Sequence, residues 1–310
     1  MAMTTVMVLV ESSDQGRCAM RAAFLAARRD GGHVVGLYPV PPSERLTPQA
    51  MYFSRASLEV PGEDGLAMLD RAERDGGAGV EAARHAFEAV AAGLGATLLE
   101  RPPNPGKLTA FFRSLSDGGP EAVAARGRVF DLVTVQQPRD DPEHRVRKLL
   151  RAVLFQAGRP VLVVPPFARD GQPASLGRRP LIAWNGSARA ARAAAIARNF
   201  FDGAREIGIL SVRTRNGAGP SAPSAPSAPS APSAQDLADY VAWHDMKASV
   251  IEVDLDGHRL GDLFLREAMR FGADLLVMGA YAQSPFRESL TGGVTNHVLS
   301  HADLPVLMTH

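Results

Sequence analysis

Short, continuous apolar segments separated by helix-like stretches are the feature of this sequence that most restricts its fold. Strands that are apolar at every position are typical of mainly parallel sheets covered on both faces. Five such segments occur in each half of the chain, at 6–10, 33–38, 96–100, 130–135 and 160–165, then at 180–184, 207–212, 249–253, 274–279 and 304–309. The alternation predicts an α/β protein with two doubly wound parallel-sheet domains in tandem.

The two halves also resemble each other in sequence. DLVTVQQ at 131–137 matches DLLVMGA at 274–280, and the last apolar segments of the two halves match in the same way. Internal similarity of this kind indicates that one unit occurs twice. We predict a first domain at residues 1–168 and a second at 179–310.

Each half carries an insertion of its own. The first half has a segment rich in Pro, Glu and Arg at 43–75, and the second half has five Pro-Ser-Ala units in a predicted loop at 217–235. Low-complexity Pro-Ser-Ala sequence cannot form a packed core, so we expect a flexible or partly extended surface loop. A neutral repeat expansion without a partner is the preferred interpretation.

Composition restricts the class of protein and its surroundings. Hydrophobic residues make up 45%, charged residues 22%, and the net charge is +1, which predicts a globular protein with neither nucleic acid nor a membrane as partner. No apolar run approaches the ~20 residues of a membrane-spanning helix. The one cysteine, Cys18, fits a buried thiol in a reducing compartment, so we expect a cytoplasmic protein.

Glycine placement in the second half indicates a binding site. Loops at the carboxyl ends of parallel strands form the ligand crevice of an open sheet. Backbone N–H groups at a helix start have no internal partner, and glycine allows a phosphate to approach them. The helix predicted to begin at Val294 follows such a glycine pair. The candidate site residues are Asn185, Gly186, Ser187, Gly279, Ala282, Thr291, Gly292, Gly293, Val294 and Thr295.

At these residues the chain resembles the universal stress protein family. Its adenine-nucleotide-binding members carry G-x2-G-x9-G-[S/T] between a strand and a helix, and here Gly279, Ala282, Gly292 and Gly293 hold those four places. The resemblance spans both halves. It implies a tandem protein with the adenine-nucleotide alpha hydrolase-like, Rossmann-type fold and a regulatory or stress-response role. It also implies that ATP or another adenine nucleotide binds in the second domain, with Asn185 facing the nucleoside.

Departures from the family pattern leave two hypotheses. Ala282 replaces a glycine, Gly293 a hydroxyl residue, and Asn185 an acidic residue, which predicts an altered or weakened nucleotide site. The alternative is a pseudo-dimeric interaction module that binds no nucleotide. In it the two domains pair through their last strands, and a homodimer is compatible with the same sequence.

The first half departs further from the pattern. Gln136 stands where Gly279 stands, and Arg147 and Lys148 fall where the glycine pair falls. Bulky side chains prevent close approach to the backbone, so we predict a degenerate site, with the basic residues forming a solvated helix face.

Other chemistry finds little support in the sequence. Phosphate-binding G-x4-G-K-[ST], dinucleotide-binding G-x-G-x-x-G after a first strand and the hydrolase motif G-x-S-x-G are absent. We therefore expect no enzyme beyond weak ATP hydrolysis, and an adenylyl-transferring enzyme ranks last. His297 and His301 are four residues apart, but no third ligand lies near them in sequence, so no metal is expected.

Overall fold

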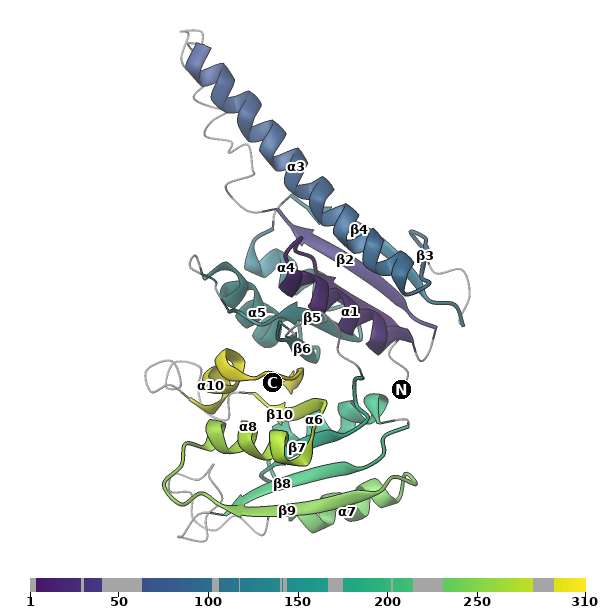
Figure 1. Cartoon of the computed structure of the whole chain (residues 1–310), viewed down its shortest axis with the longest axis vertical. Helices are drawn as coiled ribbons and strands as arrows, with labels where there is room; N and C mark the ends of the chain where they lie inside the picture. The colour runs from purple at the N-terminus through teal and green to yellow at the C-terminus, as the bar shows by residue number, and fades with distance from the viewer. Residues whose placement is uncertain are drawn as a thin grey trace.

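The protein is described by a computed structural model, whose course is drawn in Figure 1. Along 63–76 the helix path is described but the side chains are not. The described residues are 4–28, 31–40, 63–101, 106–116, 118–139, 141, 144–166, 175–201, 203–213, 231–280 and 293–310.

The strands of both halves join in one sheet of eleven strands, in the order β3-β4-β2-β1-β5-β6-β11-β10-β7-β8-β9. Every pair within a half is parallel, as the continuous apolar segments predict. The first half contributes β1 (Thr5–Leu9), β2 (His33–Pro39), β3 (Thr97–Leu98), β4 (Thr109–Leu115), β5 (Leu132–Gln136) and β6 (Val161–Val164). The second contributes β7 (Pro180–Trp184), β8 (Ile207–Arg213), β9 (Ala248–Asp254), β10 (Leu275–Gly279) and β11 (Val306–Thr309).

Each half repeats one winding order. In the second half the chain passes from β7 outward to β8 and β9, then crosses back to β10 and β11 on the other side of β7. In the first half β1, β2, β4, β5 and β6 follow the same order. The predicted fold class, two doubly wound α/β units, is confirmed. The reversal of strand order leaves a crevice between the first and fourth strands of each unit, at their carboxyl ends.

The halves meet through their last strands. β6 and β11 pair antiparallel, with Val163 opposite Val306 and Val161 opposite Met308. Leu162 lies opposite Leu307, and both side chains are fully buried. The pairing of last strands that the interaction-module hypothesis expects is therefore present within one chain.

One strand differs from the prediction. The third strand of the first half is β4, whereas the predicted strand at 96–100 is only the two-residue β3 at the sheet edge. In β4 the polar, exposed Arg113 and Ser114 directly follow the aromatic pair Phe111 and Phe112. No continuous apolar run marks this strand, because the half of it nearest the carboxyl end is solvated.

Helices cover both faces of the sheet (Figure 1). Buried side chains accordingly form two clusters, one on each face. One face carries α1 (Asp14–Arg28), α3 (Glu63–Gly93), α6 (Ala188–Ala197) and α7 (Ala234–Ala242). The other carries α4 (Pro120–Gly127), α5 (Arg145–Gln156), α8 (Leu260–Phe271) and α10 (Val294–His301). The 3₁₀ turn η2 (Arg198–Phe200) follows α6, and α3 extends beyond the sheet at its N-terminal end (Figure 1).

Local sequence signals account for several helix ends. The Ser13 hydroxyl accepts a hydrogen bond from the Gly16 N–H at 3.1 Å and so caps α1. Gly272 ends α8 in the left-handed conformation with φ +69°, the usual place of glycine after a helix. Cys18 in α1 is buried, as predicted.

The two predicted insertions are only partly described. Of the segment 43–75, residues up to 62 lie outside the described residues and the remainder belongs to α3. Most of the Pro-Ser-Ala repeat, up to residue 230, also lies outside them. The prediction of a loop as far as residue 235 is wrong, because Ser233 caps α7. Its hydroxyl accepts from the Asp236 N–H at 3.1 Å, and the Asp236 carboxylate accepts from the Ser233 N–H at 2.7 Å.

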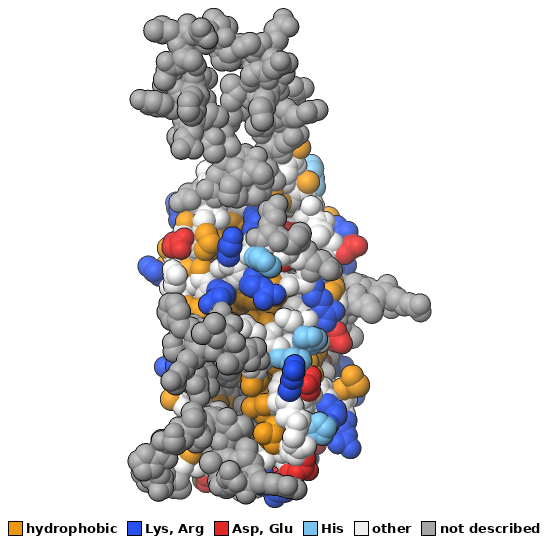
Figure 2. Space-filling model, turned by 90° about the vertical axis from the view of Figure 1, so that its left-hand side faces the viewer, with side chains coloured by type: hydrophobic (Ala, Val, Ile, Leu, Met, Phe, Trp, Pro, Cys, Tyr) orange, Lys and Arg blue, Asp and Glu red, His pale blue; other side chains and the backbone are white. Residues whose placement is uncertain are grey.

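The surface carries charges of both signs. The face shown in Figure 2 has Lys and Arg side chains near its middle with Asp and Glu among them, in keeping with a net charge of +1. In the part of the chain that the structure describes, no helix combines the length and the apolar character needed to cross a membrane.

Candidate functional site

A pocket lies at the carboxyl ends of β7 and β10, between the first turns of α6 and α10. Its volume is about 620 Å³, including the open mouth. It occupies the crevice that the strand order predicts. The lining residues are Ala183, Trp184, Asn185, Ser187, Arg189, Ala190, Val212, Phe264, Met278, Gly279, Val294 and Thr295.

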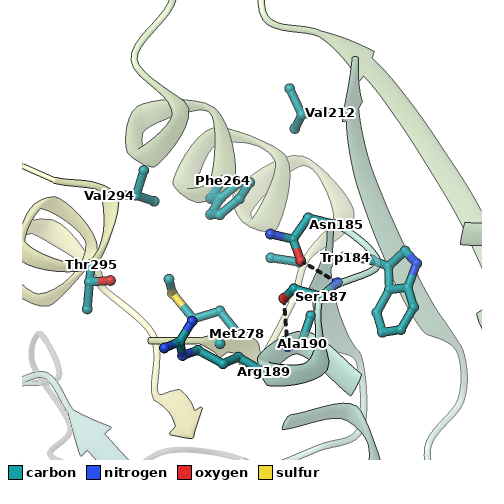
Figure 3. A pocket seen from close by; sticks show the side chains of 12 residues that line it. Trp184, Asn185, Ser187, Arg189, Ala190, Val212, Phe264, Met278, Val294 and Thr295 are labelled. Atoms are coloured by element: carbon teal, nitrogen blue, oxygen red, sulfur yellow. Dashed lines mark hydrogen bonds between the residues drawn. The ribbon is translucent and has the colours of Figure 1, made fainter. Parts of the chain in front are cut away.

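Side-chain hydrogen bonds fix the start of α6 at one wall (Figure 3). The Asn185 side-chain oxygen accepts from the Ser187 N–H at 3.1 Å, and the Ser187 hydroxyl accepts from the Ala190 N–H at 3.2 Å. Gly186 between them has φ +69°, a conformation that side chains disfavour. Ala231 and Pro232 lie against Gly186, since an added Cβ would come within 2.9 Å of both. The junction of the last two Pro-Ser-Ala units therefore packs on the loop that forms this wall.

Gly279 at the end of β10 packs against α6. A Cβ added there would lie 2.9 Å from the Arg189 Cβ and 3.1 Å from the Ala190 nitrogen. Glycine is required here by the close approach of β10 to the first turn of α6. The sequence motif predicts that Gly279 allows close approach of a ligand; in the structure it lines the pocket, and this packing contact is a second reason for glycine.

The start of α10 forms the opposite wall. Gly293 is its N-cap residue, with φ −58° and ψ 163°, and as a glycine it has no side chain to cap the helix. Val294 and Thr295 line the pocket, and Thr295 is 2% exposed. The first N–H groups of α10 have no partner within the helix, and the helix dipole favours an anion at this end.

The remaining walls combine apolar surface with one cation. Val212, Phe264 and Met278 contribute apolar side chains from β8, α8 and β10. The Arg189 side chain extends from α6 across the pocket toward α10 (Figure 3). Burial, with the nearby Arg189 and Arg192 guanidinium groups, lowers the pKa of His310 at the end of β11. The pocket thus offers an apolar surface for a flat ring and a positive charge near a helix start.

Sequence reasoning identified only part of this lining. Asn185, Ser187, Gly279, Val294 and Thr295 lie around the pocket, whereas Gly186 and Gly293 are adjacent in the chain but do not line it. Three candidate residues, Ala282, Thr291 and Gly292, lie outside the described residues.

Arg189 and Phe264 line the pocket but are not among the predicted site residues, although the helices that carry them are predicted. Arg189 is two residues after the candidate site residue Ser187, which caps α6, and Phe264 lies on the helix that follows β9. The position of Arg189 in the first turn of a helix facing the crevice was the signal that could have identified it. Trp184, expected in the core, is 7% exposed and donates its indole N–H to the Pro232 carbonyl at 2.9 Å.

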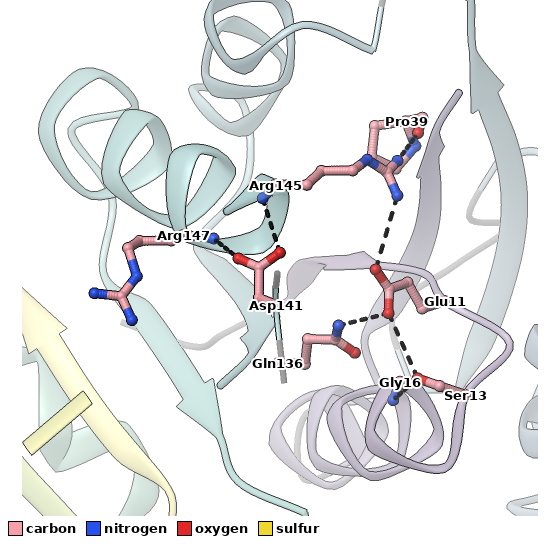
Figure 4. Close-up of polar contacts among 8 residues, drawn as sticks. All are labelled: Glu11, Ser13, Gly16, Pro39, Gln136, Asp141, Arg145 and Arg147. Carbon is pink, nitrogen blue, oxygen red and sulfur yellow. Dashed lines mark hydrogen bonds and ion pairs between the residues drawn. The ribbon is translucent and has the colours of Figure 1, made fainter. Parts of the chain in front are cut away.

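The corresponding place in the first half is nearly filled by its own side chains (Figure 4). There the pocket volume is about 260 Å³. Gln136, in the place of Gly279, donates its amide to Glu11 at 2.5 Å. Arg145 forms an ion pair with Glu11 at 3.8 Å and donates to the Pro39 carbonyl. The predicted degeneracy of the first-half pocket therefore has a structural basis.

The basic residues of the first half divide between its pocket and its surface. Arg145, not Arg147 or Lys148, fills the first-half pocket, and the latter two side chains are exposed. Their exposure agrees with the predicted solvated basic face. The Asp141 carboxylate accepts hydrogen bonds from the Arg145 N–H at 2.8 Å and the Arg147 N–H at 2.9 Å. The anion-favouring start of α5 is thus occupied by a carboxylate of the protein itself.

His297, for which the sequence predicts a place at the pocket rim or in solvent, is largely buried and does not line the pocket. Its ring packs against Gly261 of α8, its Nε2 lies 2.6 Å from the Asp262 carboxylate, and 16% of its side chain is exposed. It stacks on His301 with 4.2 Å between ring centroids. Among the described residues no group of three metal-ligating side chains occurs.

Known proteins can now be compared with this fold and pocket. The sequence model of the universal stress protein family matches residues 178–310. Residues 178–310 therefore form a universal stress protein domain. The match contains the whole of the described pocket, with both of its helix starts.

Structural comparison extends the likeness to the whole chain. A universal stress protein from Archaeoglobus fulgidus DSM 4304 aligns with 14% identity and a TM-score of 0.60, over 98% of this chain and 95% of that chain. A functionally unknown protein from Pseudomonas aeruginosa PAO1 aligns with 15% identity and a TM-score of 0.47, over 99% and 92%. No curated protein matches the sequence significantly. At this identity the Archaeoglobus structure shows that the fold of both halves together has a counterpart in a universal stress protein.

Proposed function

We propose that this chain is a stress-response regulatory protein that binds ATP or another adenine nucleotide in the pocket of its universal stress protein domain. The observation that carries the proposal is the convergence of two helix starts, one arginine and an apolar wall on a single pocket. The chain acts by binding, and no catalytic step is assigned to it.

The chemistry of the pocket fits a nucleotide. The apolar side chains of Val212 and Phe264 suit the flat surface of a base, and the Asn185 amide can bond a ribose hydroxyl or a base edge. The start of α10 and the Arg189 guanidinium favour phosphate. Asn185 lacks the charge that the family pattern supplies, and Gly293 lacks a hydroxyl. We therefore expect weaker binding than the full motif would give.

Isothermal titration with ATP, ADP and inorganic triphosphate tests the proposal, with two matched variants at the helix start. Both Ser and Asp are good N-cap residues, so Gly293→Ser and Gly293→Asp keep α10 capped. Gly293→Ser should strengthen ATP binding about fivefold to tenfold, the size of one charge-assisted hydrogen bond. Gly293→Asp should abolish binding, because its carboxylate takes the place of phosphate, as Asp141 does at the start of α5. A folded wild-type protein that binds nothing at millimolar ATP would refute the proposal.

The alternative function is a pseudo-dimeric interaction module without nucleotide. The observation that favours it is the antiparallel pairing of β6 with β11, which makes one continuous sheet from both halves. Under this alternative Gly293→Asp leaves capture of a protein partner intact. Under the nucleotide proposal the same variant removes any ATP-dependent change in partner capture.

A further inference from the structure

The first half contacts the second-half helix whose start faces the proposed nucleotide. After β5, the chain of the first half runs beside the C-terminal end of α10. Gln137 donates its side-chain amide to the Ala302 carbonyl at 3.0 Å. Arg139 donates to the same carbonyl at 3.2 Å and to the Asp303 carboxylate at 2.8 Å. Two side chains of one half therefore cap a helix of the other.

These contacts suit the end of a short helix. α10 has eight residues, and its last carbonyl groups have no partner within the helix. Helices of this length depend on contacts outside themselves. A guanidinium at the negative end of the dipole is favourable, and it adds charge-assisted hydrogen bonds. Arg139 and Gln137 therefore hold the C-terminal end of α10 in place.

Within the described residues, the arrangement is not shared by the two halves. Gln137 and Ala280 hold equivalent places after β5 and β10. The Gln137 N–H donates to the Val164 carbonyl at 2.7 Å, and the Ala280 N–H donates to the Thr309 carbonyl at 2.8 Å. Both residues are at most 1% exposed, but only Gln137 has a side chain that can reach across. The first half therefore supports a helix of the second half, α10.

The burial of Gln137 is costly by itself. Its amide oxygen is buried without a hydrogen-bond partner among the described residues, and its amide nitrogen bonds only the Ala302 carbonyl. An unsatisfied buried oxygen costs free energy. An apolar side chain would avoid this cost. The hydrogen bond from the Gln137 amide to the end of α10 is therefore the interaction that offsets the cost of burying a glutamine at this position.

We propose that Gln137 and Arg139 are positioning residues for the nucleotide site. The first half, whose own pocket is filled, serves as a support that holds α10 so that its start faces the pocket. This inference rests on the proposed function for its ligand, but the support of α10 can be measured without one. The first half would then be needed for affinity although it touches no nucleotide.

Hydrogen exchange and ATP titration on the full chain test the inference. Arg139→Ala and Gln137→Ala should each speed amide exchange along α10 in the absence of nucleotide and weaken ATP binding about fivefold, the size expected for a charged or buried bond at a helix end. Arg139→Lys, which keeps the charge, should restore most of both properties. The control is Arg147→Ala, another first-half arginine, whose exposed side chain makes no hydrogen bond or ion pair with the described residues of α10.

The outcomes separate the two proposals. Unchanged exchange along α10 in both variants would overturn the support of α10, whether or not ATP binds. Faster exchange with unchanged ATP affinity would overturn the positioning role. If wild-type protein binds no ATP, the proposed function fails, and the positioning role falls with it, while exchange along α10 still decides whether the first half supports the helix.

Discussion

Replacement of Gly279 by alanine tests whether this glycine is needed for packing or for a ligand. The added Cβ would lie 2.9 Å from the Arg189 Cβ and 3.1 Å from both the Arg189 carbonyl carbon and the Ala190 nitrogen. Optimal carbon–carbon separations are about 3.5–4.0 Å, so the shortfall to the Arg189 Cβ is about 0.6–1.1 Å. Two of the three atoms belong to the backbone of α6, so they cannot rotate away as the end of a side chain can.

The expected cost of Gly279→Ala is about 1–3 kcal/mol in the free energy of unfolding, the usual size for an overpacked core position. For a domain of 150–250 residues, each kcal/mol lowers the Tm by about 2–4 °C. Thermal and urea unfolding followed by far-UV circular dichroism, without nucleotide, measures this cost. The matched control is Gly93→Ala at the end of α3, where an added Cβ meets nothing within 4 Å. Gly93→Ala should leave the midpoint unchanged or raise it slightly.

A Gly279→Ala protein as stable as the control would refute the packing argument. If such a protein also lost ATP binding, the glycine would be required for ligand approach alone, as the sequence analysis first assigned it. A destabilised protein that still bound ATP when folded would show that packing against α6 is the whole reason for the glycine.

Two further predictions concern stability. Burial lowers the pKa of His33, whose Nδ1 lies 2.9 Å from the Thr109 hydroxyl, so the native state favours neutral imidazole. Its contribution to stability is complete above the unfolded value of 6.5 and is lost as pH falls toward the lower native pKa. In urea unfolding between about pH 5 and 8, His33→Gln should flatten this pH dependence, and an unchanged slope would contradict the assignment. Ser233→Ala should destabilise α7 by about 1 kcal/mol and Ser233→Thr by much less, measured as shifts of the urea midpoint; equal midpoints would argue against the cap.

Much of the candidate site follows from its place in the chain. Asn185, Ser187 and Val294 each follow a strand or begin a helix that the local pattern predicts, and parallel strands bring their carboxyl ends to one edge. Arg189 and Phe264 could not be chosen in this way. Which residues of a helix face a pocket depends on how that helix is rotated against the sheet, and neighbouring elements set that rotation.

The filled pocket of the first half shows the same limit. The substitution at Gln136 predicted a degenerate site, but not that Arg145 would fill it. The amide of Gln136 meets a carboxylate 125 positions earlier in the chain, that of Glu11. No periodicity in the sequence encodes a contact over that separation.

The sequence by itself determined the alternation of strands and helices, the repetition of one α/β unit and several helix ends. These depend on apolar periodicity, on capping residues such as Ser13 and on glycines such as Gly272, which act within a few residues. Only the tertiary structure decided that β4 is the third strand of the first half and that β6 pairs with β11. It also decided that Gln137 and Arg139 reach the end of α10. Such features arise where distant segments compete for the same buried surface and the same hydrogen-bonding groups, and that competition is settled by packing of the whole chain.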